Sequence, residues 1–215
     1  ASLLVLCAGN ALAVPVINGT NAAGEWTTGL FLNAFDVNDG GIPDGYDLMR
    51  VAMIQESSGG AADGLYILIE LWGVPTFASA GAGPVYYLTS LDINLNGDIS
   101  TPLDLLPNDA VDRVIDYRSV GGVTVKDGTG AGVAGLPTGA LGSVVELYIP
   151  FGMFSSFPVG GFNTISYLDN GGTPADDFTP DTGSNTTVPE PASVMLLGMG
   201  LIGLAGSMFR RKFMA

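Results

Sequence analysis

Residues 65–72 read LYILIELW, and this run carries the strongest fold signal in the chain. Its side chains are apolar on both faces of an extended chain, and Glu70 is the only charged residue among them. A strand that is apolar on both faces is typical of the middle of a sheet that is covered on both sides. We therefore expect residues 65–72 to form a central strand.

Shorter strand-like runs surround this one at a regular spacing, and Gly- and Asx-rich turns separate them. None of the intervening segments shows the 3.6-residue period of a soluble helix. Such a series predicts an all-β protein, an antiparallel β-sandwich of about eight or nine strands, to which a C-terminal hydrophobic helix is appended. The predicted strands are residues 27–35, 48–55, 65–72, 85–93, 111–118, 120–125, 144–150 and 162–168.

The charge of the chain is strongly acidic. The whole sequence has 21 acidic and 7 basic residues and a formal net charge of −14. Residues 14–189 hold 20 of those 21 acidic residues but only 4 of the 7 basic ones, which leaves a net charge of about −16. Such a surface repels nucleic acid and anionic lipid, so we expect no nucleic-acid partner.

The final 28 residues, 188–215, divide into three parts. Val188-Pro189-Glu190-Pro191 is an extended motif because each proline fixes its own φ and biases the preceding residue away from helix. Residues 192–209 carry no charge, and as a helix they would be about 27 Å long, enough for a thin bilayer core. The basic cluster Arg210-Arg211-Lys212 follows, and positive clusters of this kind stay on the cytoplasmic side of a membrane.

This tail resembles the PEP-CTERM sorting signal, which an exosortase recognises and cleaves in Gram-negative bacteria that make polysaccharides. The resemblance implies an exported protein, anchored transiently in the inner membrane by its C-terminal helix and then sorted to the cell surface or extracellular matrix. The exosortase-type protease is thus an expected partner. An ordinary C-terminal membrane anchor is the alternative interpretation, and it too places the domain outside the cytoplasm.

The N-terminal residues agree with export. Residues 1–8 are an apolar run too short to span a membrane, and Ala11-Leu12-Ala13 has the A-x-A pattern of a signal-peptidase site. We expect a signal peptide over 1–13 that lacks its basic n-region, a β-sandwich domain over 14–172, a linker over 173–187 and the sorting signal over 188–215. The single cysteine, Cys7, then leaves with the signal peptide; a lipoprotein anchor at Cys7 is the alternative, although Leu6 fits a lipobox poorly.

The order of motifs in the domain resembles that of DOMON-like domains and family-9 carbohydrate-binding modules. The matching features are the opening Ile17-Asn18-Gly19 with Trp26, the strand Gly64-Leu65-Tyr66-Ile67, the strand end at Asp92, the strand of residues 145–150 and the closing residues 177–181. The resemblance implies a jelly-roll-like β-sandwich that binds sugars, haem or other ligands, often with a structural calcium ion. It also implies that Trp26 belongs to the core. Because the haem-binding members use His and this chain has none, haem is not expected.

Two Asx-rich loops have spacings suited to Ca²⁺, which prefers several oxygen ligands on a glycine-kinked loop. In the first, Asp36, Asn38, Asp44 and Asp47 fall at positions 1, 3, 9 and 12 of a calcium loop, with a departure at Gly40. In the second, Asp92, Asn94, Asn96 and Asp98 lead the loop, with Leu103 at position 12. We expect Ca²⁺ in at least one loop; ordinary Asx turns are the alternative. A third acidic group, Asp169, Asp176, Asp177 and Asp181, fits a solvated linker better.

Sugar-binding proteins use exposed aromatic rings, and the candidates here are Trp72, Tyr86, Tyr87 and Tyr148. Core packing is the alternative for each of them. Because adjacent residues of a strand face opposite ways, one of Tyr86 and Tyr87 is expected to point outward.

Catalysis is not expected, since the mature chain would have neither His nor Cys for the common nucleophile and base arrangements. The leading hypothesis is an exported protein that binds extracellular polysaccharide non-catalytically with calcium-stabilised loops. The competing hypothesis is a structural surface or biofilm-matrix protein that acts through protein–protein contacts or self-association. A third, weaker one is a glycosidase with two facing carboxylates.

Overall fold

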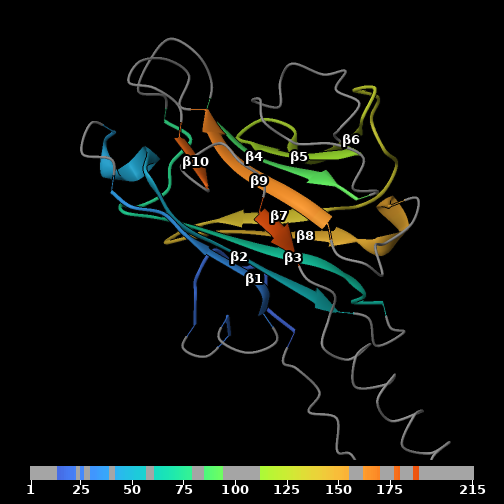
Figure 1. Cartoon of the computed structure of the whole chain (residues 1–215), viewed down its shortest axis with the longest axis horizontal. Helices are drawn as coiled ribbons and strands as arrows, with labels where there is room; N and C mark the ends of the chain where they lie inside the picture. Colours follow the sequence, from blue (N-terminus) through green and yellow to red (C-terminus); the bar gives the residue numbers. More distant parts are fainter. Residues whose placement is uncertain are drawn as a thin grey trace, which may run out of the picture.

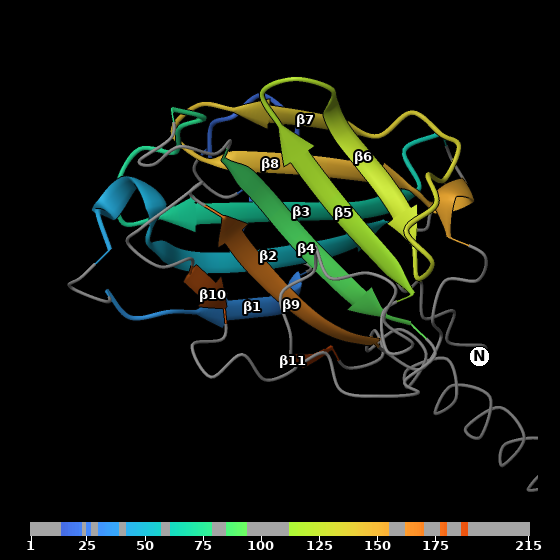
Figure 2. The ribbon, with the colours of Figure 1, turned by 90° about the horizontal axis from the view of Figure 1, so that it is seen from above.

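The computed structural model describes residues 14–22, 25–26, 30–38, 42–56, 61–78, 85–93, 112–154, 162–169, 177–179 and 186–188. These residues form two antiparallel sheets that pack face to face, with strands that cross at an angle (Figures 1 and 2). The predicted all-β sandwich is therefore confirmed. In this described part no helix is both long and apolar enough to cross a membrane. The helix expected over 192–209 lies outside it.

The first sheet has the strand order β1-β2-β3-β8-β7. Its central strand is β3 (Gly64–Leu71), as the apolar run LYILIELW predicted. On one side β3 pairs with β2 (Leu48–Glu56), and on the other with β8 (Val145–Pro150). The edge strands are β1 (Leu30–Phe35) and the short β7 (Thr138–Leu141).

The second sheet has the order β10-β9-β4-β5-β6. It contains β4 (Tyr86–Asp92), β5 (Arg113–Arg118), β6 (Gly122–Asp127), β9 (Phe162–Asp169) and β10 (Asp177–Thr179). A further strand, β11 (Thr186–Val188), also pairs with β9. Two short 3-10 helices, η1 (Asp44–Tyr46) and η2 (Phe151–Met153), lie at strand ends.

Three strands were not predicted from the sequence: β7, β10 and β11. They have three or four residues each, too few for an alternating pattern to stand out. Two of them, β10 and β11, fall mostly within 173–187, which was expected to be a linker. The second sheet therefore continues to Val188, well past the expected domain end at residue 172.

The core lies between the two sheets, where alternate residues of each strand point inward. On β3 the inward residues are Leu65, Ile67 and Ile69, all essentially inaccessible to solvent. The residues between them, Tyr66 and Leu68, face away from this core and yet are also buried. A second apolar layer covers the outer face of the first sheet, which explains why β3 is apolar on both faces.

The outer layer comes from the N-terminal residues of the described chain. Trp26 is fully buried in a cluster with Ala52, Ile54, Tyr66, Leu68 and Val144, against which Ile17 and Tyr148 also pack. Trp26 thus belongs to a core, as expected, but to this second cluster on the outer side of the sheet rather than to the one between the sheets. Burying its large ring contributes roughly 2–3 kcal/mol to the attachment of the N-terminal segment.

Candidate functional site

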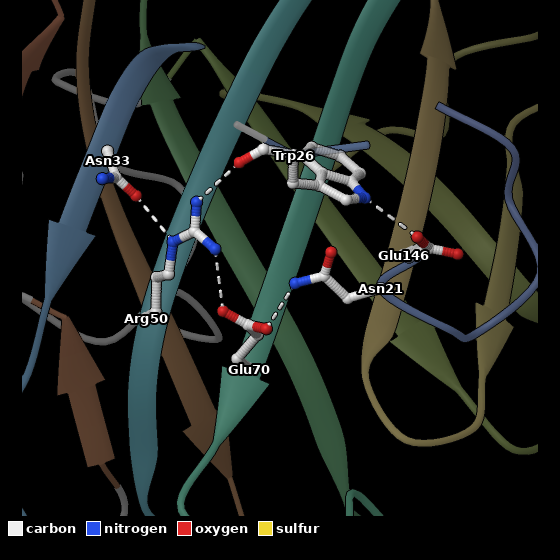
Figure 3. A network of polar contacts seen from close by, with 6 residues as sticks. All are labelled: Asn21, Trp26, Asn33, Arg50, Glu70 and Glu146. Atoms are coloured by element: carbon white, nitrogen blue, oxygen red, sulfur yellow. Dashed lines mark hydrogen bonds and ion pairs between the residues drawn. The ribbon is translucent and has the colours of Figure 1, made fainter. Parts of the chain in front are cut away.

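A row of polar side chains crosses the outer face of the first sheet beside Trp26 (Figure 3). Four neighbouring strands supply one residue each: Asn33 from β1, Arg50 from β2, Glu70 from β3 and Glu146 from β8. The strand register explains the contact at the centre of this row, because Arg50 lies directly opposite Glu70. Sequence reasoning did not identify this network, although Glu70 and Glu146 were visible as lone charges in apolar strands.

The guanidinium of Arg50 joins three parts of the molecule. Its Nε donates to Asn33 Oδ1 (2.6 Å), its Nη1 to Glu70 Oε2 (3.0 Å) and its Nη2 to the carbonyl of Trp26 (2.9 Å). Asn21 Nδ2 in turn donates to Glu70 Oε1 (2.7 Å). The side chains of Arg50 and Glu70 are each only 13% exposed, so solvent screens their ion pair less than it would a surface pair.

Glu146 holds the N-terminal segment through its buried carboxylate. Its Oε2 accepts the backbone N–H groups of Asn18 and Gly19, both at 2.8 Å, and its Oε1 accepts Trp26 Nε1–H at 3.0 Å. Gly19 has φ +79°, and a Cβ there would lie 2.7 Å from Gly142 N, so the turn requires glycine. These contacts engage both carboxylate oxygens in holding the chain, which gives the network a structural role.

The first candidate calcium loop lies at the end of the first sheet where β1 and β3 finish and β2 begins. Asp36 and Asp47, at the two strand ends, are buried, whereas Asp44 is exposed on η1. Asn38 Nδ2 donates to Asp44 Oδ1 at 3.4 Å, a long hydrogen bond. The four candidate oxygen ligands thus lie in one loop region, two of them buried at strand ends and Asp44 exposed, and their role as Ca²⁺ ligands stays a prediction.

The same end of the sheet also receives Asp177 from β10. This residue is buried, and its carboxylate accepts the backbone N–H of Leu48. Asp177 was expected to lie in a solvated linker, and that expectation is wrong because β10 packs against β2. Within the described residues no group of three or more His, Cys, Asp or Glu side chains is arranged to hold a metal ion.

Trp72 directly adjoins the calcium-loop candidate. Its backbone N–H donates to the carbonyl of Asp47 (2.9 Å), and the N–H of Gly73 donates to the carbonyl of Asp44 (2.6 Å). Trp72 as a whole residue is 44% exposed. The loop therefore holds the stretch of backbone that carries this aromatic side chain.

The four aromatic candidates do not share one surface. Tyr148 lies on the outer face of the first sheet, where its ring packs against Tyr66 with centroids 4.8 Å apart and burial raises its pKa. Tyr86 lies on the second sheet, and the guanidinium of Arg118 sits 3.9 Å from its ring centroid. Among the four aromatic candidates, only Trp72 lies beside the first candidate calcium loop.

Tyr87 is a core residue, so its selection as a surface aromatic was wrong. It is fully buried, and its hydroxyl both donates to the carbonyl and accepts the N–H of Thr76, each at 2.9 Å. Burial raises its pKa strongly. The expectation that one of the two adjacent tyrosines faces outward is confirmed, and the outward one is Tyr86, which is half-buried.

Other candidates lie partly outside the described residues. In the second calcium loop Asp92 is buried at the end of β4, while Asn94, Asn96 and Asp98 lie outside. Asp176 and Asp181 also lie outside. In the sorting motif Val188 is the last residue of β11. The remaining motif residues, Pro189, Glu190, Pro191, Arg210, Arg211 and Lys212, are not among those described.

The comparisons with known proteins identify the tail. A profile of the PEP-CTERM protein-sorting motif matches residues 187–212. A comparison with curated proteins finds no match to the chain. The β-sandwich is therefore joined to a signal that directs export to the cell envelope or surface and processing by an exosortase. The Pro-Glu-Pro motif, apolar run and basic cluster predicted an exosortase-type sorting signal, and this prediction is confirmed.

Proposed function

We propose that this exported β-sandwich binds extracellular polysaccharide, without catalysis, at the end of the first sheet. The observation that carries the proposal is the hydrogen bonding of exposed Trp72 and its neighbour Gly73 to the backbone of the acidic loop. A half-exposed indole offers a flat apolar face to a sugar ring, and nearby amide and carboxylate oxygens can accept its hydroxyl groups. Asn38 and exposed Asp44 supply such groups.

In this proposal Ca²⁺ stabilises the loop rather than taking part in chemistry. Asp36, Asn38, Asp44 and Asp47 offer the oxygen donors that Ca²⁺ prefers, and binding would require their side chains to gather around the ion, because in the structure the three carboxylates are not arranged around one point. The carbonyl of Asp47 accepts the N–H of Trp72, and the carbonyl of Asp44 accepts the N–H of Gly73. Ordering the loop would therefore also order the backbone that carries the indole. The resemblance of the motif order to family-9 carbohydrate-binding modules supports the same class of ligand.

The test is retention of the domain on soluble and insoluble polysaccharides, with Ca²⁺ and again with a chelator. Trp72→Ala should abolish retention, whereas Leu136→Ala, which removes another exposed apolar side chain, should not. Asp44→Ala should reproduce the effect of the chelator on both retention and Tm. If the folded, monodisperse domain is retained by no polysaccharide, sugar binding is refuted for the glycans tested.

A second candidate function is assembly at the cell surface through contacts between proteins. It is favoured by the exposed apolar residues Phe35, Val37 and Val74, which are 63–71% exposed and surround the same loop. Phe35 closes edge strand β1, and an edge strand can pair with another chain. The test is whether the domain associates as its concentration rises. Association that is abolished by Phe35→Ser and by Val37→Ser would support this function over sugar binding.

A further inference from the structure

We propose that pairing of β11 with β9 controls access of the processing protease to the sorting motif. The matched motif begins at residue 187, and β11 spans Thr186–Val188. Thr187 lies opposite Asn163 and Val188 opposite Phe162 in an antiparallel ladder. The first two residues of the matched motif, Thr187 and Val188, are therefore paired within the folded sheet. This overlap becomes visible only when the bounds of the motif are compared with those of β11.

The edge of β9 is shared by two short strands that differ in how they are held. Along one half, β10 pairs with residues 166–168 of β9, and its Asp177 also bonds across to Leu48 of the other sheet. Along the other half, β11 pairs with residues 162–164 and lies against β1 (Figure 2). Because β10 has its own anchor, β11 can separate from β9 while β10 and the sandwich stay in place.

Such a separation is required for cleavage close to the motif. Proteases bind an extended stretch of substrate on both sides of the scissile bond, and a backbone paired within a sheet cannot make those hydrogen bonds at the same time. Cleavage of a folded protein therefore proceeds from a locally opened state, at a rate that depends on how often the segment opens. Short terminal strands are among the segments that open most readily.

The distance to the membrane strengthens this argument. From Val188 to Ala192, where the expected membrane-spanning run begins, there are only four residue steps. A fully extended chain covers about 3.5 Å per residue, so paired β11 holds the sandwich within about 14 Å of that run. Separation as far back as Thr179 lengthens the connection to thirteen residue steps, or about 45 Å, which gives a membrane enzyme room to engage the motif.

The experiment locks β11 to β9 with a disulfide in the full-length chain. The variant Thr164→Cys/Thr186→Cys replaces two residues that lie opposite each other in the ladder and outside the matched motif, in a Cys7→Ser background, and is expressed in a host that carries an exosortase. A C-terminal epitope and pulse–chase labelling follow removal of the tail. We expect the oxidised variant to lose its tail more slowly by on the order of tenfold or more, and a membrane-permeable reductant to restore the normal rate.

Two further variants separate gating from damage to the motif. The single variant Thr186→Cys, which leaves the matched motif intact, should be processed at the normal rate, and Thr186→Pro, which disrupts pairing, should be processed faster. Unchanged processing of the oxidised double variant would overturn the proposal. Failure of the disulfide to form would also overturn it, because the strands would then not be paired. A wild-type chain that retains its tail would do the same, because there would be no processing to control.

Discussion

Replacing Glu146 with glutamine changes one atom of a buried group that holds the N-terminal segment. The carboxylate accepts three N–H donors, from Asn18, Gly19 and the Trp26 indole, at 2.8–3.0 Å. A glutamine amide has one oxygen, which can serve the two backbone donors. Its NH₂ group then faces the indole N–H, so that two donors oppose each other.

The cost follows from these contacts. A lost hydrogen bond to a buried charged group costs about 1.5–3 kcal/mol, and the two bonds that remain weaken because their acceptor becomes neutral. We therefore expect Glu146→Gln to lower the free energy of unfolding by about 3 kcal/mol. For a domain of this size, whose total stability is about 5–15 kcal/mol, that corresponds to a Tm lower by roughly 6–12 °C.

Urea unfolding of residues 14–188, followed by far-UV circular dichroism, measures the effect. Trp26→Phe supplies the matched control because it removes the indole N–H and keeps an aromatic ring. In that background Glu146→Gln should cost about 1–2 kcal/mol less, since no donor opposes the amide. A Glu146→Gln domain within about 0.5 kcal/mol of the wild type, or costs that are equal in the two backgrounds, would show that Glu146 does not hold the segment as described.

Two more predictions concern the first sheet. Gly64→Ala should destabilise the domain by about 1–3 kcal/mol in the same urea assay, because its Cβ would lie 2.5 Å from the Ile149 carbonyl oxygen and 2.4 Å from the Tyr148 ring. The control is Gly152→Ala, whose Cβ meets no atom within 4 Å and which should change stability by less than about 0.5 kcal/mol. Equal effects of the two substitutions would contradict this packing. Burial raises the pKa of Tyr66 to about 12, so the unfolded chain, with a tyrosine pKa of about 10, ionises first, and stability should fall as pH rises from about 10 to about 12. A pH titration of the urea midpoint checks this, and the fall should be shallower in Tyr66→Phe; identical slopes would exclude Tyr66 as its source.

The candidate site could be predicted only where its signal was local. The spacing of Asp36, Asn38, Asp44 and Asp47 was visible in one loop, but the structure does not arrange their three carboxylates around one point, so their role as ligands stays a prediction. The link between this loop and Trp72 could not be predicted, because it depends on backbone hydrogen bonds that form when β2 and β3 pair. The inward position of Tyr87 and the burial of Asp177 depend in the same way on the packing of distant strands.

The sequence by itself determined the all-β class, the central position of β3 and the sorting tail. These are properties of short segments, because the two-residue period of a strand and an 18-residue apolar run are both set by neighbouring residues. Only the tertiary structure decided where the short strands β7, β10 and β11 pair and how Glu146 meets Trp26, 120 residues away in the chain. Such contacts depend on sheet register and on burial of a polar group against its partners, and neither leaves a periodic trace in the local sequence.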